Sequence, residues 1–546
     1  MAKFRIHPAI GFARLGNSDE SHPGPTVPWA DQAPATYRDN TPAKRLKKQE
    51  ARFWVYLHDE AAPGVEPVRV DVGPDKAVRK IEWTVHVANR KAAWYEFDGL
   101  TGSNGVLGPE PFGYPADSLR NPTGSRDDWT IDPGPVSADM PGDTRAFSKT
   151  PPNGFWPTFA VGAGNSSGID TLGKMTVMAD SGLSVVGGSG NSGSVTGSPI
   201  HHYANNPGWF DDTSDGSVKA LLTLADGSKV EAEGAWVVVG PPDFAPPIGN
   251  VVTLYDAMYD VAVRKRDFDV NLFNAGAFVN TFTPSFEEHI YPILRRAALY
   301  RWVYDEGAPD PSAYHGSLDR IAQLGTPPTA AGDPNKPRRQ AIFNRLRSPA
   351  NANASTIEDH KMPKLYGDLG EGASALTLTE TQFFLLSQWK DGKFTRGGGP
   401  LPPVPATNVT ASGLDRAALE ACVGGAFFPG IECGWIVREA ALYVTPFAFR
   451  FKHAVSESDH TGVWPGDVTK RSALPWQADF IDCADNWWPA QRPNQVRRSA
   501  TDPSFVQWAA GLDSHIDMVM NWHELGVVVK APNDDVYFES ERNLVR

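Results

Sequence analysis

Cysteines and tryptophans gather in one stretch near the C-terminus of this sequence. The three cysteines of the chain are Cys422, Cys433 and Cys483. They form no CxxC pair of the kind that binds zinc, and they are too few for a disulfide scaffold. Five of the 17 tryptophans lie in the same region, at positions 435, 464, 476, 487 and 488. A buried aromatic core explains tryptophans in general. It does not explain segments 418–435 and 473–494, whose glycines and prolines predict a rigid backbone that could hold reactive side chains in a fixed geometry.

Other residues that could carry chemistry form weaker patterns. His201 and His202 are adjacent, so on a strand they point to opposite faces and cannot share one metal ion. No metal site is expected. The serine-containing GNSSG (164–168) lacks the strand–turn–helix context of a catalytic serine. In DDTSDG (211–216) the spacing misses the calcium-binding EF-hand pattern. Asx-turns account for these aspartates, with substrate positioning as the functional alternative.

The elements that would position these residues change type along the chain. Segments 51–57 and 79–90 alternate aromatic and β-branched residues with polar ones, which predicts strands. Segment 218–242 predicts two strands joined at an Asp-Gly turn and then a buried third strand. The glycine- and serine-rich stretch 181–199 predicts a flexible turn between strands, because it lacks the context of a phosphate-binding loop.

Helical spacing of apolar residues begins near position 250. It predicts helices around 254–269, 289–305 and 379–394, the last with Thr379 or Thr381 as its cap. A further helix through 414–423 is expected to end at Gly424 or Gly425. The fold class is therefore α+β. We expect a β-rich, sandwich-like domain over residues 1–260 and a mainly helical domain over 261–546 that carries the site.

Composition and charge exclude several classes of function. The net charge of −13 argues against a nucleic-acid or anionic-membrane partner, since either needs a basic surface. No apolar stretch is long enough for a transmembrane helix, and the first residues lack the features of a signal peptide. The cytoplasm is the default location, with specialised export left open. Glycine (51) and proline (47) are abundant, which favours long ordered loops.

Several ordered motifs resemble the family of L-lysine ε-oxidase and glycine oxidase, whose cofactor is cysteine tryptophylquinone. The resemblance extends over most of the chain. The matching segments are IHPAIGFARLGNS (6–18), YANNPGWFDDTSDGSV (203–218), GAWVVVGPPDFAP (234–246), LDRAALEACVGGAFFPGIE (414–432), ALPWQADFIDC (473–483) and WWPAQRPN (487–494).

This resemblance implies a cofactor made from the protein's own side chains. It places a thioether between the Cys422 sulfur and the Trp487 indole, with two further ring carbons oxidised to an ortho-quinone. Cys433 and Trp488 are the rivals for the two positions. Cys483 is expected to be a small buried hydrophobe.

The implied activity is oxidative deamination of a primary amine, that of an amino acid first of all. Free side chains offer no acceptor for two electrons from a C–H bond, so a cofactor must supply one. A quinone carbonyl is electrophilic, and a neutral primary amine can attack it. A general base then removes the α-proton. Molecular oxygen is reduced to hydrogen peroxide, and ammonia is released.

Several side chains compete for the role of that base. His453 lies between the two cofactor residues in sequence, with Asp482, Asp485 and Glu432 as rivals. Asp479 is a further rival in the same motif as Asp482. Arg492 could bind a substrate carboxylate through a bidentate contact, or it could anchor its loop to an acidic neighbour.

One position departs from the pattern that the resemblance implies. An acidic residue is expected about one helical turn before the cofactor cysteine, where it assists cofactor formation. Ala418 occupies that place. Asp415 lies seven residues before Cys422 and shares its face if the helix continues, so it is the substitute candidate.

The resemblance also implies partners. They are a separate flavoprotein that matures the quinone, a small amine or amino-acid substrate with O2, and further copies of the chain in a dimer or tetramer. Two alternatives stay open. One is an oxidase that acts on an amine of a peptide or protein. The other is a non-catalytic scaffold that never forms the quinone.

Overall fold

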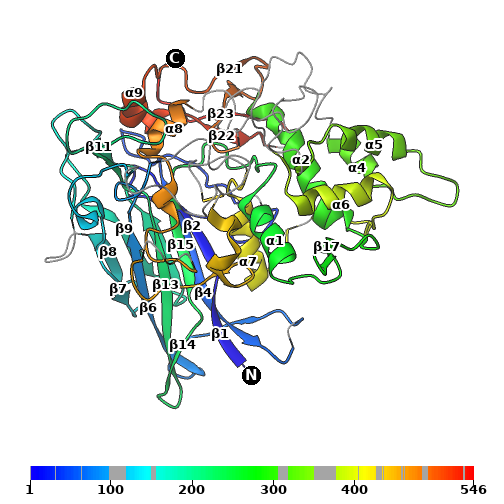
Figure 1. Ribbon diagram of the computed structural model, residues 1–546, viewed down its shortest axis with the longest axis horizontal. Coiled ribbons are helices and arrows are strands. Elements are labelled where there is room, and N and C mark those ends of the chain that lie inside the picture. Colours follow the sequence, from blue (N-terminus) through cyan, green and yellow to red (C-terminus); the bar gives the residue numbers. More distant parts are fainter. Residues whose placement is uncertain are drawn as a thin grey trace.

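The β-rich half is built around one sheet of 13 strands (Figure 1). The computed structural model describes residues 2–545 except 31, 63, 97–118, 149–154, 305–317, 350–376, 404, 426–432, 435, 457–458, 460, 483–489 and 533–534. The strands of the sheet are β1 (Ala2–His7), β2 (Ile10–Arg14), β3 (Ser21–Pro23), β4 (Lys48–Asp59), β5 (Val68–Arg69), β6 (Val78–Ala88), β7 (Val136–Ala138), β8 (Thr144–Ser148), β9 (Thr171–Val177), β10 (Leu183–Gly187), β13 (Ser214–Leu224), β14 (Lys229–Glu231) and β15 (Ala235–Gly240).

The sheet curves into a nearly closed barrel. Its main path runs β7-β6-β13-β15-β2-β4-β10-β9-β8, and the two end strands, β7 and β8, lie close together (Figure 1). The expected β-rich half is confirmed, and its layers belong to one curved sheet. Among the paired strands of this path, β15 and β2 are parallel, with Gly240 opposite Arg14. The carboxyl ends of these two strands therefore meet at one edge of the barrel.

The expected strands follow from local sequence. β4 and β6 cover the segments with alternating residues, and β15 is buried along its whole length. The Asp226-Gly227 turn joins β13 to β14, as expected. Gly227 adopts a positive φ of 87° there, and Asp226 Oδ1 accepts a hydrogen bond from Ser228 N at 2.9 Å. This is an Asx-type turn.

Helices gather in the second half of the chain (Figure 1). The α-helices are α1 (Leu254–Lys265), α2 (Tyr291–Leu299), α4 (Leu318–Leu324), α5 (Lys336–Asn344), α6 (Glu380–Lys390), α7 (Ala411–Glu420), α8 (Trp476–Asp482) and α9 (His515–Asn521). The expected cap of α6 is confirmed at Thr379, whose side chain accepts from Gln382 N in a capping box. Among the described residues, none of the helices is long and apolar enough to cross a bilayer.

Small hairpins accompany the helices in the second half. They pair β16 (Phe273–Asn274) with β17 (Ala277–Phe278), β18 (Tyr443–Thr445) with β19 (Ala448–Phe449), β20 (Gln495–Arg497) with β21 (Phe505–Gln507), and β22 (Val527–Lys530) with β23 (Tyr537–Ser540). A division near position 260 stays a prediction, and α1 spans that position. The more helical half packs against the barrel, with α7 against β1 and β2.

A buried layer joins the two halves. Phe12 of β2 and Val238 of β15 pack with Met258 of α1, and both Cys422 and Cys433 lie in the same apolar cluster. The cysteine-bearing segment is thus held directly on the edge where β2 and β15 end.

The glycine- and serine-rich turn has a structural role beyond joining strands. It connects β10 to β11 (Ser192–Ser194), which pairs with β12 (Trp209–Asp211). Asp212 Oδ2 accepts hydrogen bonds from Ser189 N at 2.7 Å and Asn191 N at 3.0 Å. A Cβ at Gly188 would lie 2.3 Å from that oxygen, so only glycine fits. The turn is therefore closed over a buried carboxyl group.

We expect Asp212 to make the fold less stable at alkaline pH. Burial raises the pKa of Asp212 to about 7, and its Oδ1 has no partner among the described residues. The pKa of Asp212 is higher in the folded protein than in the unfolded chain. The protonated side chain therefore contributes its full stability at pH values below the ordinary carboxyl pKa. This contribution is lost as pH rises through about 7. Asp212→Asn should therefore gain stability relative to wild type between pH 5 and pH 8, by roughly 1–3 kcal/mol.

Thermal unfolding at the two pH values measures this difference. Asp226→Asn is the control, because that exposed carboxyl has a pKa lowered by Ser228 and should show no such gain. An equal effect of Asp212→Asn at pH 5 and pH 8 would contradict the neutral state of this group.

Candidate active site

Cys422 lies just past the C-terminus of α7 and is fixed to the start of α1. The Cys422 carbonyl accepts from Leu254 N at 2.9 Å, and Gly424 N donates to Val252 O at 3.0 Å. A Cβ at Gly424 would lie 2.1 Å from Thr253 O, so this close approach requires glycine. The prediction that the helix would reach Gly424 or Gly425 is wrong. The helix ends at Glu420, because the next residues pair with the α1 start instead of continuing the helix.

The sulfur of Cys422 is buried beside a guanidinium group. Arg14 Nη2 donates to the sulfur at 3.4 Å and to Ala421 O at 3.2 Å. The sulfur itself lies 3.2 Å from Ala418 O, one helical turn back. Arg14 is 3% exposed. The Arg14 guanidinium therefore fixes the position of the Cys422 sulfur at the end of α7.

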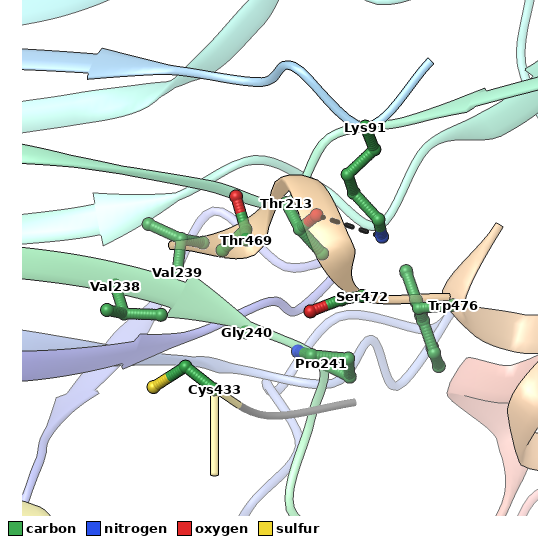
Figure 2. A pocket seen from close by; sticks show the side chains of 10 residues that line it. All are labelled: Lys91, Thr213, Val238, Val239, Gly240, Pro241, Cys433, Thr469, Ser472 and Trp476. Atoms are coloured by element: carbon green, nitrogen blue, oxygen red, sulfur yellow. Dashed lines mark hydrogen bonds between the residues drawn. The ribbon is translucent and has the colours of Figure 1, made fainter. Parts of the chain in front are cut away.

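A pocket opens at the carboxyl ends of β2 and β15 (Figure 2). About 280 Å³ of empty space lies in and in front of it, open solvent included, and the enclosed cavity itself measures about 10 Å³. Its walls combine apolar groups with donors and hydroxyls, and they come from both halves of the chain. The lining residues are Lys91, Thr213, Val238, Val239, Gly240, Pro241, Cys433, Thr469, Ser472 and Trp476.

Arg14 connects this pocket to Cys422. Its Nη1 donates to the carbonyl of Pro241, a wall residue, at 3.4 Å, while Nη2 contacts the sulfur. Gln491 approaches from the other side, with Nε2 3.2 Å from Pro242 O. The loop at 240–242 therefore contacts both Arg14, which touches Cys422, and Gln491.

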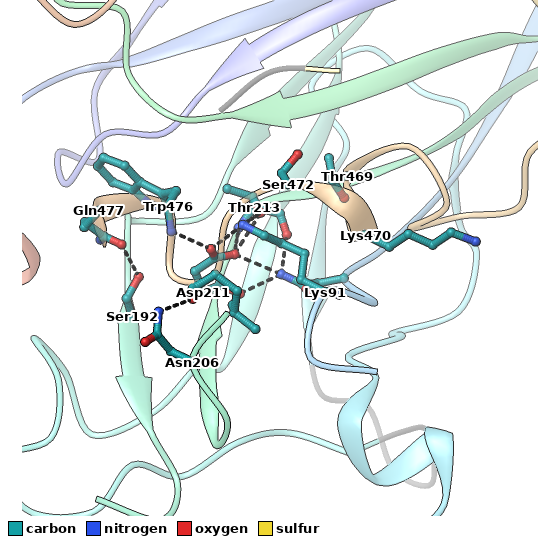
Figure 3. Close-up of polar contacts among 12 residues, drawn as sticks. Lys91, Ser192, Asn206, Asp211, Thr213, Thr469, Lys470, Ser472, Trp476 and Gln477 are labelled. Atoms are coloured by element: carbon teal, nitrogen blue, oxygen red, sulfur yellow. Dashed lines mark hydrogen bonds and ion pairs between the residues drawn. The ribbon is translucent and has the colours of Figure 1, made fainter. Parts of the chain in front are cut away.

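A buried ion pair joins the pocket residue Lys91 to Asp211 (Figure 3). Lys91 Nζ lies 2.5 Å from Asp211 Oδ2, and both side chains are almost completely buried. The same carboxylate accepts from Trp476 N at 3.1 Å and from Thr213 Oγ1 at 2.8 Å. Asn89 Nδ2 contributes a further hydrogen bond at 3.1 Å. Asp211 thus joins the β-rich half to the first turn of α8.

A second carboxyl group of the same motif holds the preceding segment. Asp215 Oδ1 accepts from Thr469 N at 2.7 Å and Thr469 Oγ1 at 2.6 Å, and Oδ2 accepts from Trp236 Nε1 at 3.0 Å. Burial raises the pKa of Asp215 to about 6. Both aspartates therefore hold the 466–476 segment, which contributes three pocket residues.

Buried cations surround Asp467 behind this segment. Its Oδ1 lies 2.6 Å from Arg90 Nη1 and 2.8 Å from Lys470 Nζ, and its Oδ2 lies 3.2 Å from Lys452 Nζ. These charges lower the pKa of Asp467, while burial lowers the pKa of Lys470 to about 7. Lys470 Nζ also lies 3.6 Å from the centre of the Trp94 ring. Lys470 is therefore only partly charged at neutral pH, and Arg90 and Lys452 supply the excess of positive charge around Asp467 near the pocket.

Comparison with known proteins gives this arrangement its context. Residues 7–239 match the family described as L-Lysine epsilon oxidase N-terminal, and residues 359–509 match L-lysine epsilon oxidase C-terminal domain. The chain is 30% identical to L-lysine 6-oxidase of Marinomonas mediterranea, over 91% of this chain and 73% of that protein. This chain belongs to the L-lysine ε-oxidase family. The resemblance seen in the motifs is confirmed.

Solved structures of the family have the same fold. L-Lys ε-oxidase from Marinomonas mediterranea, in its Schiff base intermediate with L-Lys, superposes with a TM-score of 0.81 at 26% identity. That match covers 99% of this chain and 95% of the other. A second structure of the ε-lysine oxidase from that organism gives a TM-score of 0.80.

Asp415 has partners other than the expected cofactor cysteine. Its carboxylate accepts from Ala9 N at 2.6 Å and lies 3.0 Å from His7 Nδ1. His7 in turn contacts His58 Nε2 at 2.9 Å. The premise that α7 continues to Cys422 is not met, because the helix ends first. The role of Asp415 in cofactor formation stays a prediction, and its contacts show that it anchors α7 to the end of β1 and to the residues that lead into β2.

The candidate bases lie in different surroundings. His453 is exposed, whereas the pocket walls are mostly buried. Asp482 is the last residue of α8 and lies 2.8 Å from His515 Nε2. Asp479 is fully buried in the same helix. The predicted residues Trp487, Trp488, Cys483, Asp485 and Glu432 lie outside the described residues. Their roles, and those of His453 and Asp482, stay predictions.

Arg492 is buried and holds α8. Its Nε donates to Phe480 O at 2.6 Å, and its guanidinium carbon lies 5.1 Å from the centre of a ring of Trp508. These contacts are with a backbone carbonyl and an aromatic ring, so both expected roles, binding a substrate carboxylate and anchoring the loop to an acidic neighbour, stay predictions.

Sequence reasoning missed Arg14, Lys91 and Trp476 as site residues. Arg14 stands among apolar residues in FARLG, and a charge in such a run was a usable signal of a buried function. Lys91 carries no such signal, because NRKAAW reads as an ordinary strand end. Trp476 was counted only as one of the clustered tryptophans.

We expect Asp211→Asn to destabilise the fold severely. The substitution leaves the buried Lys91 ammonium without its counter-charge, which costs about 3–5 kcal/mol when one partner of a buried pair is removed. Urea denaturation should show this loss, and adding Lys91→Met should recover part of it by removing the lone charge.

The matched control is Asp139→Asn, which breaks the exposed Lys80–Asp139 pair of the same barrel and should cost nothing measurable. Equal losses for Asp211→Asn and Asp139→Asn would show that the buried pair does not hold the two halves together.

Proposed function

We propose that this chain is an amino-acid oxidase that deaminates a primary amine with a quinone made from Cys422 and Trp487. In the net reaction, the amine, O2 and water give a carbonyl compound, ammonia and hydrogen peroxide. The observation that carries the proposal is the position of Arg14. It contacts the Cys422 sulfur and the carbonyl of Pro241, a pocket residue, at once, and so links Cys422 to the pocket, which Cys433 lines directly.

The surroundings of Cys422 are compatible with this cofactor. Its sulfur is buried, and the contact with the Arg14 guanidinium fixes its position. Gln491 Oε1 is buried and has no hydrogen-bond partner among the described residues. A polar atom left in this state marks a place where another polar group is accommodated. When formed, the quinone supplies the electrophilic carbonyl and the acceptor for two electrons that side chains lack.

The protein's own side chains would do the rest of the work. Val238, Val239 and Pro241 form an apolar wall that excludes water from a bound substrate. Arg14 fixes the sulfur against the helix end. The base that takes the α-proton is proposed among Asp482, Asp485, Glu432 and His453, as the motifs suggest.

Family membership supports an amino acid as the substrate. The solved relative is described with L-Lys in a Schiff base intermediate. A separate flavoprotein that forms the quinone and assembly into dimers or tetramers remain part of the proposal. The described residues contain no group of three or more side chains able to hold a metal ion.

Mass spectrometry tests the cofactor first. The quinone adds two oxygens and removes two hydrogens, and the thioether removes two more. Protein from cells with the flavoprotein should therefore be roughly 28 Da heavier than its sequence predicts. A cross-linked peptide pair containing Cys422 and Trp487 should carry the difference. An unmodified mass with and without the flavoprotein would contradict the oxidase proposal and favour the scaffold alternative.

Variants of the candidate cysteines and tryptophans identify which pair forms the cofactor. Cys422→Ser and Trp487→Phe should abolish both the added mass and peroxide release, because each removes one end of the cross-link. Cys433→Ser and Trp488→Phe are the matched controls and should keep the mass. The opposite result would show that Cys433 and Trp488 form the cofactor.

A further inference from the structure

We propose that Lys91 and the indole N–H of Trp476 bind the substrate's carboxylate, which makes the enzyme selective for amino acids over plain amines. The inference rests on the proposed function, because it assigns part of the same pocket. It names the substrate class that the pocket admits.

The polar side chains that line the pocket are suited to an anion. Lys91 is the one charged side chain among the ten lining residues, and no carboxylate is among them. Thr213, Thr469 and Ser472 add hydroxyl groups. A pocket with an ammonium group and no carboxylate wall favours an anionic ligand group over a cationic one.

Lys91 keeps one donor for a ligand. An ammonium group has three N–H donors. Two of them are accounted for by Asp211 Oδ2 at 2.5 Å and Thr213 Oγ1 at 3.3 Å. Figure 2 shows the Lys91 chain extending toward Ser472 and Trp476, with its nitrogen as the leading end. The third donor is therefore available at the pocket.

Trp476 provides independent support. Its side chain is 1% exposed, and its Nε1 is buried without a hydrogen-bond partner among the described residues. An indole N–H that stays unpaired when buried costs free energy. A carboxylate oxygen in the pocket would satisfy this donor.

One carboxylate fixes both donors in place. Asp211 Oδ2 accepts from Lys91 Nζ and from the backbone N of Trp476. It also accepts from Thr213 and Asn89, so its own acceptors are occupied. Asp211 itself is fully buried and is not among the lining residues, so it orients Lys91 without facing the ligand.

The buried charges nearby strengthen this preference. Arg120 donates to the carbonyls of Lys91 at 3.1 Å and of Ser472 at 3.0 Å, both of them pocket residues. Three cations share Asp467 behind the same segment. Because the surroundings are of low dielectric, this excess of positive charge attracts a carboxylate more strongly than it would in water.

The first test compares each amino-acid substrate with the amine formed by removing its carboxyl group. We expect kcat/KM, from peroxide release, to be about 100-fold or more higher for the amino acid, because the amine leaves buried donors unpaired. Equal kcat/KM values for the two compounds would overturn the inference.

The double variant Lys91→Met/Asp211→Asn removes the charge without leaving a lone buried partner. It should lose most of the preference, mainly through KM for the amino acid. Lys80→Met/Asp139→Asn is the matched control on an exposed pair and should keep it. A preference that persists in the folded Lys91 variant would also overturn the inference.

A binding measurement separates this inference from the proposed function. Trp487→Phe cannot form the quinone, so its binding of propanoate, hexanoate and 3-phenylpropanoate by calorimetry needs no activity. We expect at least one acid to bind about tenfold or more tightly than its amide. Loss of this binding with Lys91→Met/Asp211→Asn supports the inference even if no quinone forms. Equal binding of every acid and its amide overturns it, whatever the cofactor result.

Discussion

The buried carboxylate of Asp211 is the constraint on which the site depends. It belongs to the barrel half, yet it binds the backbone N–H of Trp476 at the start of α8 and the ammonium of Lys91 beside it. A buried ion pair contributes little net stability by itself. Its value here is positional, because both of its partners line the pocket. Without this carboxylate, Lys91 and the backbone of Trp476 would lose the acceptor that holds them side by side at the pocket.

Arg14 connects the pocket to Cys422 in a similar way. The parallel pairing of β2 and β15 puts Arg14 opposite Gly240, so its guanidinium reaches the Pro241 carbonyl. The close approach of Gly424 to Thr253 brings Cys422 to the same edge. One guanidinium therefore contacts a cysteine that lies 408 positions away in the chain. The family's N-terminal and C-terminal motifs form one site because these contacts cross between them.

Burial explains most of the pKa shifts of the charged groups around the site. Asp212 and Asp215 have raised pKa values because they are buried, and Lys470 has a lowered one for the same reason. Asp467 differs because three cations surround it and lower its pKa. The aspartates of DDTSDG thus serve two purposes. Asp212 closes a turn in the barrel, while Asp211 and Asp215 hold the segment that forms a pocket wall.

The sequence by itself determined the class of most elements and the family. Alternation of side chains placed β4 and β6, the Asp226-Gly227 turn placed β14, and Thr379 placed the start of α6, because these signals act within a few residues. The ordered motifs along the chain, with the one around Cys422 among them, were together specific enough to identify the family. Only the tertiary structure decided where α7 ends, because contacts with α1 replace the last helical turn. It alone brought Arg14 and Lys91 to the pocket, since pairing across hundreds of residues depends on sheet register and packing that no local pattern encodes.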